Sequence, residues 1–404
     1  MKAKIVQLDW TDANEVTLLE NGTAFFPALC EAIDQAQHSV QLETYIFKLD
    51  RTGRHILETL LRACRRGVKV RVVIDGFGSA DDAEKITLDV TQAGGQCLVF
   101  RPEPKRLARW VFTRQRLRRL HRKIAVVDGE VAFVGGINII DDYDDLEPGN
   151  GGPEVPRFDY AVAVRGPMVD HAVRAQQWLW LRLHWGRLGS RSRGWRRLKP
   201  NIPTANVVLK DKPLRAALVL RDNLRYRRTF EQAYLYGLEH AQHEILIANA
   251  YFLPGKPFRR ALINAKRRGV RVRVLVQGKV EYHMQYHATR ALYAPLLAAG
   301  IEIYEYMPSF LHAKVAVIDA IAAVGSSNID PFSFLLAREA NVLLDDARFA
   351  GQLQHSLERA IHEGGTRICA DAYHSRGWIR RFVDACAYRL VRMGIAVAGA
   401  PSEY

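Results

Sequence analysis

The feature that most constrains the fold is a stretch of sequence that occurs twice. Residues 63–76 read ACRRGVKVRVVIDG, and residues 265–278 read AKRRGVRVRVLVQG. Each copy combines the basic end of a helix, a glycine that can end that helix (Gly67, Gly269), and an alternating valine-rich run that is typical of a strand. Repetition at this level of detail predicts a duplicated α/β unit rather than two unrelated domains.

The same order of elements continues on both sides of each copy. A run ending ETYIF at residues 43–47 precedes the first copy, and a run ending NAYFL at residues 249–253 precedes the second. An HxKxxxxD motif then follows at His121 and again at His312. The sequence therefore predicts an α/β fold that consists of a strand, a helix, a strand and a later hairpin, present twice.

A linker-like segment divides the chain between the two copies. Residues 186–206 are rich in Gly, Ser, Pro and Arg, as is typical of a domain boundary. This segment predicts an N-terminal half over residues 1–200 and a C-terminal half over residues 201–375, each with one motif. A basic amphipathic tail is expected over residues 376–404.

The first motif lies in HRKIAVVDGEVAFVGGIN, which starts at His121. Apolar residues flank Asp128 and the glycine after it, which is a strong hairpin signal. Residues i and i+2 of a strand share a face, so His121 and Lys123 should project together. The returning strand should bring Asn138 beside them. Asp128 stands an odd number of residues from the histidine, at the turn, and is expected to be structural.

The second motif lies in HAKVAVIDAIAAVGSSNID, which starts at His312. It repeats the arrangement with Lys314, Asp319 and Asn328. Five residues lie between Asp319 and the next glycine, against six in the first copy. We therefore expect the second hairpin to be one residue shorter.

Histidine, lysine and asparagine on one surface suit a phosphoryl group. Neutral imidazole can attack phosphorus, while lysine and asparagine donate to the non-bridging oxygens. A second histidine can protonate the departing alkoxide and then take a proton from an incoming alcohol or water. Each histidine also needs a carboxylate on its other ring nitrogen. The candidates are Asp159 in RFDYAVAV and Glu339 in REANVLL.

These motifs resemble the phospholipase D superfamily, whose signature is a duplicated HxKxxxxD followed by GGxN or GSxN. The resemblance covers nearly the whole chain and implies two similar phospholipase D-type α-β-α sandwich halves packed pseudo-symmetrically around one active site. It also implies a phosphohistidine intermediate at the interface between the halves. It implies His121 as the nucleophile and His312 as the general acid and base. The catalytic residues that it implies are His121, Lys123, Asp128, His312, Lys314 and Asp319, with Asn138 and Asn328 binding phosphate and Asp159 and Glu339 orienting the histidines.

Within the superfamily, VVIDGFGS, IANAYFLPG and VGSSNIDPFS are most similar to bacterial cardiolipin synthases that lack N-terminal transmembrane helices. That resemblance implies a phosphatidyltransferase with phosphatidylglycerol as acceptor and as the favoured donor, although ethanolamine could be the donor's leaving group. It implies no metal or other cofactor, and it implies anionic phospholipids and a membrane surface as partners rather than nucleic acid. The implied location is peripheral, on the cytoplasmic side of a bacterial inner membrane. A phospholipase or nuclease that uses water is the alternative, and a non-enzymatic basic scaffold is a third hypothesis.

The net charge and three basic segments bear on whether the partner is a phospholipid surface or a nucleic acid. The chain has 58 Lys and Arg against 43 Asp and Glu, a net charge of +15, which points to a polyanionic partner. Residues 101–123 mix basic and large apolar residues, as do a membrane-interface segment and a nucleic-acid groove. Residues 178–195, rich in Trp and Arg, fit an interface or a core helix equally well. Residues 378–400 predict an amphipathic helix that either lies in a membrane interface or packs on the domain.

Several other signals carry less weight. The first residues show no signal peptide, and no uncharged run approaches the ~20 residues that span a bilayer, so we expect a soluble or membrane-surface protein. The five cysteines are scattered, which favours a reducing compartment. His283 and His287 have the spacing of zinc ligands but no third ligand, so we expect them to line the substrate groove. The acidic segment 141–152 lacks EF-hand spacing and is predicted to be a solvated loop.

Overall fold

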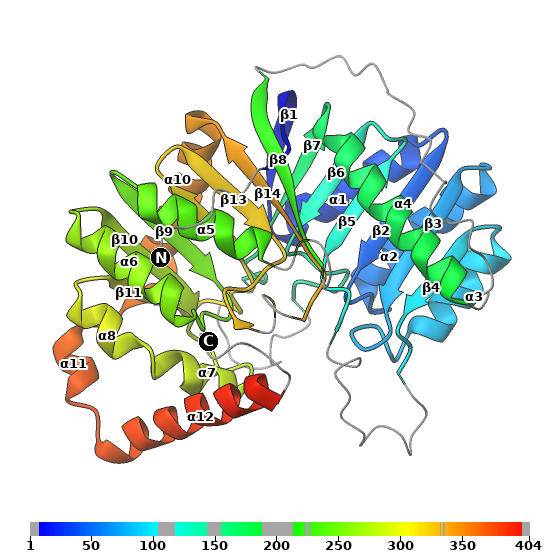
Figure 1. Ribbon diagram of the computed structural model, residues 1–404. Coiled ribbons are helices and arrows are strands. Elements are labelled where there is room, and N and C mark those ends of the chain that lie inside the picture. The colour runs from blue at the N-terminus through cyan, green and yellow to red at the C-terminus, as the bar shows by residue number, and fades with distance from the viewer. Residues whose placement is uncertain are drawn as a thin grey trace.

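The computed structural model of the 404-residue chain describes residues 8–103, 118–143, 155–187, 213–222 and 226–397, apart from residues 227, 332, 334 and 335. Within these ranges the chain forms two α/β halves that lie side by side (Figure 1).

The elements of the N-terminal half are β1 (Trp10–Glu20), α1 (Asn21–Gln35), β2 (Ser39–Thr44), α2 (Arg51–Arg65), β3 (Lys69–Asp75), α3 (Ala83–Gln92), β4 (Gln96–Phe100), β5 (Lys123–Val127), β6 (Val131–Gly135), β7 (Tyr160–Arg165) and α4 (Met168–Arg187). Those of the C-terminal half are β8 (Leu214–Arg221), α5 (Thr229–His240), β9 (Glu244–Asn249), α6 (Lys256–Arg267), β10 (Arg271–Gln277), α7 (His283–Arg290), α8 (Tyr293–Ala298), β11 (Glu302–Tyr306), β12 (Lys314–Ile318), β13 (Ile321–Gly325), β14 (Glu339–Asp345), α10 (Ala347–Gly364), β15 (Gly365–Arg367), α11 (Ala370–His374) and α12 (Trp378–Val397).

The strands form one continuous sheet, and its order is symmetric about its centre. The order is β15-β11-β10-β9-β12-β13-β14-β8-β1-β7-β6-β5-β2-β3-β4. The two halves join where β1 and β8 pair antiparallel, with Trp10 opposite Ala217. Outward from this junction, β7-β6-β5-β2-β3-β4 in one half correspond to β14-β13-β12-β9-β10-β11 in the other. The prediction of two similar α/β halves is therefore confirmed.

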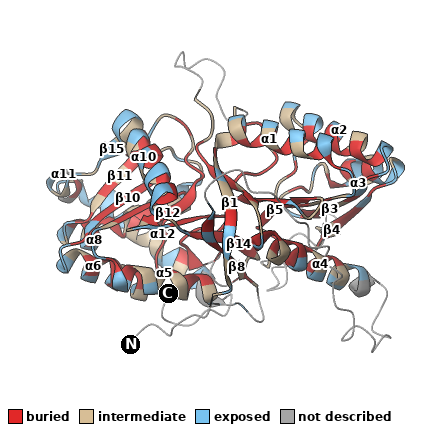
Figure 2. Ribbon diagram, turned by 90° about the horizontal axis from the view of Figure 1, so that it is seen from above, coloured by how far each residue is buried: buried red, intermediate tan, exposed pale blue. Residues whose placement is uncertain are grey.

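Helices cover both faces of the sheet in each half. Strands β2 and β3 run parallel, as do β9 and β10, and their buried residues need cover on both sides. Figure 2 shows α1 and α2 on one face of the N-terminal half and α4 on the other. By its place in the chain α10, which follows β14, corresponds to α4, which follows β7, yet α10 lies on the face that carries α1. Corresponding helices therefore lie on opposite faces, and we infer that a pseudo-twofold axis relates the two halves.

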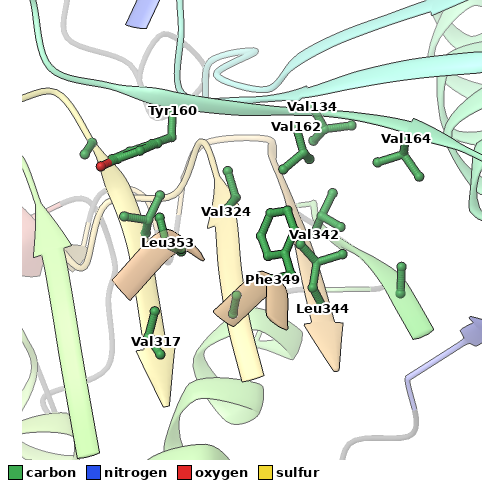
Figure 3. Close-up of a cluster of buried hydrophobic side chains, with 14 of the residues drawn as sticks. Val134, Tyr160, Val162, Val164, Val317, Val324, Val342, Leu344, Phe349 and Leu353 are labelled. Carbon is green, nitrogen blue, oxygen red and sulfur yellow. The ribbon is translucent and has the colours of Figure 1, made fainter. Parts of the chain in front are cut away.

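A shared apolar core joins the two halves. Val134 of β6 faces Val324 of β13 and Val342 of β14, and all three side chains are buried (Figure 3). Tyr160 of β7 crosses to α10, where its hydroxyl lies 2.7 Å from Ser356 Oγ. Burying one such valine contributes about 1.5–3 kcal/mol. Because β5 and β12 carry the histidine motifs, this packing fixes the two motifs relative to each other.

Glycines end the two repeated helices, as the sequence predicts. Gly67 and Gly269 have φ values of +86° and +95°, in the left-handed region that glycine adopts most readily. The valine N–H after each glycine donates a hydrogen bond back into its helix at 3.1 Å.

The strands that precede the two repeats, β2 and β9, align one position away from the alignment that matches ETYIF with NAYFL. Val40 and Ile245 occupy equivalent positions, because they pair with Val127 and Ile318, each six residues after its histidine. The true offset is therefore one residue smaller than the offset between the two quoted runs. The match between the two runs was wrong by one position because it followed their similar aromatic residues. The register of each strand with its neighbour is set instead by the hydrogen bonds between the strands.

The predicted boundary at residue 200 lies outside the described residues. The predicted tail over residues 376–404 contains α12, which is amphipathic and basic. None of the described helices is both long enough and apolar enough to cross a membrane.

Candidate active site

The backbone holds the first histidine against the C-terminal half. His121 lies two residues before the start of β5, and its N–H donates to the carbonyl of Arg338 at 2.9 Å. The N–H of Arg338 in turn donates to the carbonyl of Arg119 at 2.8 Å. Glu339 follows directly, so the backbone places His121 beside this carboxylate.

The second histidine is held in the same way against the N-terminal half. His312 lies two residues before β12, and its N–H donates to the carbonyl of Phe158 at 2.8 Å. The N–H of Phe158 donates to the carbonyl of Phe310 at 2.9 Å. Asp159 follows directly, so each motif is fastened to the strand of the other half that carries a candidate carboxylate.

The histidine–carboxylate pairs are therefore crossed between the halves. His121 Nδ1 lies 3.0 Å from Glu339 Oε1, and His312 Nδ1 lies 2.6 Å from Asp159 Oδ2. The sequence suggested both carboxylates but left the pairing open. With Nδ1 engaged, Nε2 is the ring nitrogen that can reach a substrate.

The two carboxylates differ by one methylene, and their surroundings match this difference. Ser326 Oγ donates to Glu339 Oε2 at 2.5 Å, which fixes the longer side chain. The corresponding residue of the first motif is Gly136, where a Cβ would overlap the Asp159 carboxylate. Sequence reasoning missed the role of this position, although the difference between GGxN and GSxN is its signal.

Both motif lysines are buried beside their histidines. Lys123 is 5% exposed and Lys314 is 2% exposed, and each ammonium donates to the carbonyl of its own motif's histidine. Burial lowers the pKa of Lys123 to about 7 and that of Lys314 to about 8. A bound phosphodiester anion would favour the charged form of both, so the lysines form a cationic floor for that group.

The surroundings of both imidazoles favour the neutral form. Burial lowers the pKa of His121 below its usual value, and burial together with Lys314 lowers the pKa of His312 much further. Burial also raises the pKa of Asp159 to about 7, so the surroundings disfavour charge on both members of that pair. Neutral imidazole is the form that can act as a nucleophile.

The two motif asparagines lie three residues beyond the ends of β6 and β13, and their place beside the histidines stays a prediction. Asn138 Oδ1 accepts a hydrogen bond from the Ile46 N–H at 3.2 Å, and Asn138 is 6% exposed. Asn328 is 5% exposed, and its Oδ1 has no hydrogen-bond partner among the described residues. The shorter second hairpin does not shift Asn328, because the missing residue is absorbed in the turn and Gly325 keeps the place of Gly135.

The two motif aspartates lie away from the histidines. Asp128 accepts hydrogen bonds from the N–H groups of residues 37–39 at 2.7–2.8 Å. Asp319 does the same for residues 242–244 at 2.8–2.9 Å. Seven residues of extended chain, roughly 23 Å, separate each aspartate from its histidine. The structure therefore does not bring the aspartates into the histidine cluster, and it gives them the turn position expected of Asp128.

Replacing Asp128 with asparagine should lower the free energy of unfolding by about 1–2 kcal/mol, because an amide supplies one acceptor oxygen to three N–H groups. Activity per folded molecule should change by less than about twofold. Urea unfolding and turnover measure the two effects, and Asp319→Asn should behave alike. A stable but inactive Asp128→Asn protein would contradict the structural role.

An aromatic ring that sequence reasoning missed lines the first histidine. The Tyr45 ring centroid lies 4.9 Å from the ring of His121, and Lys123 Nζ lies 5.4 Å from the same tyrosine ring. Tyr45 belongs to the ETYIF run, which was noticed only as part of the repeat. The Tyr45 ring therefore packs against the imidazole of His121.

A polar pocket lies beside the second histidine. Its wall includes Gln277, whose Oε1 accepts a hydrogen bond from the N–H of Leu311 at 2.9 Å. Gln277 Nε2 and Gln285 Oε1 are buried without partners among the described residues. The lining also includes Tyr251, Glu281, Tyr282 and Tyr286. Hydroxyl and amide groups of this kind suit an alcohol-bearing ligand.

The residues that line this pocket do not include His283 or His287. His283 and His287 are on α7, and His287 Nδ1 lies 2.8 Å from Asp384 of α12, so this histidine joins two helices. No group of three or more metal-ligating side chains occurs among the described residues. Most of the basic segment 101–123 and of the acidic segment 141–152 lies outside the described residues, as does the end of the segment 178–195.

Comparison with known proteins gives the same family throughout. A family described as "Cardiolipin synthase, PLD-like domain" matches residues 29–143 and 234–361. "Cardiolipin synthase B" of Shigella flexneri is 36% identical over 395 residues, covering 98% of this chain and 92% of that protein. The protein of the same name from Escherichia coli K12 is 35% identical with the same coverage. A probable cardiolipin synthase of Bacillus subtilis is 29% identical, covering 93% of this chain and 71% of that protein.

Solved structures show the same fold at low sequence identity. The crystal structure of phosphatidylserine synthase from Haemophilus influenzae has a TM-score of 0.68 at 14% identity, covering 97% of this chain and 95% of that chain. Polyphosphate kinase from Porphyromonas gingivalis has a TM-score of 0.53 at 14% identity, covering 95% of this chain and 53% of that chain. These likenesses concern the fold and leave the chemistry to the site.

Proposed function

Because the chain belongs to the cardiolipin synthase family of phospholipase D-like proteins, we propose that it transfers a phosphatidyl group from one phospholipid to a hydroxyl group of another. Phosphatidylglycerol is the proposed acceptor and the favoured donor, which makes cardiolipin the product. The observation that carries the proposal is the pair of crossed histidine–carboxylate contacts above two buried lysines. This arrangement supplies a nucleophile, an acid–base group and a site for phosphate charge.

In the first half of the reaction, His121 Nε2 attacks the phosphorus of the donor lipid. The bond between phosphorus and the headgroup oxygen breaks, and His312 gives a proton to that oxygen, so glycerol leaves. Lys123 and Lys314 hold the non-bridging oxygens, where negative charge accumulates. The result is a phosphatidyl group bound to His121.

The second half reverses these roles. His312 takes the proton of the acceptor hydroxyl, whose oxygen attacks the phosphorus as the bond to His121 breaks. Burial and Lys314 hold the pKa of His312 well below its usual value. The negative charge of the bound phosphodiester raises that pKa, so His312 takes up a proton from solvent as the donor lipid binds.

We place the alcohol in the polar pocket beside His312. The histidine that exchanges protons with alcohols should adjoin the groups that bind their hydroxyls, and Gln277 joins the pocket wall to the residue before His312. The unpartnered amide atoms of Gln277 and Gln285 can pair with a glycerol headgroup. This pocket favours an alcohol acceptor over water, which needs no such binding groups.

The proposed partners are anionic phospholipids at a membrane surface, and the proposed location is the cytoplasmic side of a bacterial inner membrane. A net charge of +15 favours such a surface. A nuclease with water as acceptor would use the same histidines, so the substrate must be tested directly.

The purified chain should form cardiolipin and an equal amount of glycerol from phosphatidylglycerol vesicles in the presence of EDTA. Mass spectrometry of the lipids, with and without phosphatidylethanolamine, identifies the donor, and single-stranded DNA is assayed in parallel. Phosphatidic acid as the only product would make water the acceptor. Cleavage of DNA alone would overturn the lipid proposal, and loss of activity with EDTA would overturn the metal-free scheme.

A further inference from the structure

The last helix is fixed to the C-terminal half by one narrow side. Figure 1 shows α12 along the edge of that half, next to α7. Asp384 bonds His287 Nδ1 at 2.8 Å and Arg376 Nη1 at 3.0 Å, while Ala387 and Val391 are buried in the core. Counting 100° per residue, these three α12 residues fall within an arc of about 60°.

The opposite side of α12 is apolar and uncovered. Its exposed side chains are Trp378 (71%), Ile379 (60%), Phe382 (60%), Val383 (40%), Leu390 (59%) and Met393 (64%). The same count places all six within an arc of about 140° that does not include the packed side. A continuous apolar stripe of this size marks an interaction surface rather than scattered exposure. The sequence left open whether this helix packs on the domain or lies in a membrane interface, and the structure shows that one side of it packs.

Arginines run along the apolar stripe. By the same count, Arg389 lies within the stripe and Arg381 and Arg392 lie beyond one edge of it, whereas Arg380 falls on the packed side. Asp384 is the one acidic residue in the sequence of α12, and it faces His287 on the packed side. The uncovered side therefore combines apolar side chains with positive charge alone.

The stripe lies at the active-site end of its half. Lys314 pairs with Asn249, the last residue of β9, so the motif lies where the parallel strands end. Helix α7 follows the end of β10, next to β9, and Tyr282 before it lines the pocket beside His312. Tyr282 is 56% exposed and Met284 of α7 is 51% exposed, so apolar exposure extends from α12 toward the pocket.

We propose that the uncovered side of α12 docks the enzyme on an anionic phospholipid surface, with the apolar stripe in the interface and the arginines at the headgroups. The proposal rests on the proposed function, because it takes the substrate lipids as the docking surface. Apolar side chains bordered by cations, with a tryptophan at one end, match the layered chemistry of a membrane interface. A second copy that paired through the same stripe would bring these arginines against their own counterparts, because the one acidic residue in the sequence of α12 faces the packed side.

The test compares two matched variants of the full chain. One carries Ile379→Gln, Phe382→Gln and Leu390→Gln. The control carries Leu88→Gln on α3, which removes a side chain that is 54% exposed in the other half. Sedimentation with vesicles of phosphatidylglycerol and phosphatidylethanolamine measures binding. The triple variant should bind at least about tenfold more weakly than the parent chain, and the control should bind like the parent.

Activity separates this proposal from the proposed function. In detergent micelles, where no docking step is needed, the triple variant should form cardiolipin at the parent rate. Retained vesicle binding by the folded triple variant would overturn the docking proposal. A variant that lost only its oligomeric state, and not its vesicle binding, would overturn it too. Absence of lipid products from the parent chain in micelles would instead overturn the proposed function.

A second variant covers the case in which the triple variant fails to fold. Arg381→Glu with Arg389→Glu should weaken binding to anionic vesicles at low salt and have little effect on binding to phosphatidylcholine vesicles. Equal binding of this variant and the parent to anionic vesicles would overturn the role of the arginines.

Discussion

Replacing His121 with alanine is expected to reduce turnover by about 10⁴-fold or more, because the change removes the atom that bonds phosphorus. The carboxylate partner Glu339 keeps its hydrogen bond from Ser326, so the folded structure should persist. Cardiolipin formation measures the loss, and thermal unfolding checks the fold. Activity within tenfold of the parent would exclude His121 as the nucleophile.

His312→Ala should also lose activity, and a donor lipid with a different leaving group distinguishes its defect from that of His121→Ala. With phosphatidylglycerol, loss of the acid–base group should cost about 10²–10⁴-fold. With a phosphatidyl donor whose leaving group is 4-nitrophenolate, which needs no proton, His312→Ala should still release a burst of nitrophenolate and retain the phosphatidyl group on the protein. His121→Ala should give no burst. The reverse pattern would exchange the roles of the two histidines.

Asp159→Asn is expected to resemble His312→Ala, although Asp159 belongs to the other half of the chain. The crossed contact at 2.6 Å sets the ring orientation and tautomer of His312, and loss of such a partner costs about 10²–10⁴-fold. The 4-nitrophenyl donor should restore the burst in Asp159→Asn. Glu339→Gln should instead fail with both donors, because its partner is His121.

A matched control separates this effect from general loss of carboxylates. Asp345 lies at the end of β14, is paired with Arg215 and is half-exposed. Asp345→Asn should leave both assays within about twofold of the parent, as is usual for a surface change far from the site. A burst in Glu339→Gln but not in Asp159→Asn would show that each carboxylate serves the histidine of its own half.

Much of the fold and the content of the site could be predicted from the sequence, because both depend on local pattern. Valine-rich alternation, the helix-ending glycines Gly67 and Gly269, and the Asp128 turn are each encoded within a few residues. The duplicated motif then indicates one site made from two copies. The registers of β5 with β6 and of β12 with β13 follow from the same short-range signals.

The crossed pairing could not be predicted, because no local pattern encodes it. His121 and Asp159 are close in sequence, whereas the Glu339 partner is 218 residues away. The pairing depends on the backbone contacts that His121 and His312 make with the opposite half, and those form only when both halves are folded. Tyr45 and Ser326 were missed for a different reason, because each acts through a contact within its own half, Tyr45 with His121 and Ser326 with Glu339, that only the folded sheet brings together.

The crossed contacts also constrain how such a chain could have arisen. A single half would bring a histidine and a carboxylate that do not meet, so an ancestor with one motif would have been active only as a symmetric pair of identical subunits. In that pair every change would occur twice, on the nucleophile side and on the proton-transfer side alike. Joining two copies in one chain removed that restriction. The site of one histidine could then keep Asp159 against Gly136, while the site of the other took Glu339 with Ser326. Helix α7 could likewise form in the C-terminal half alone. The duplication thus allowed the surroundings of the two histidines to change separately.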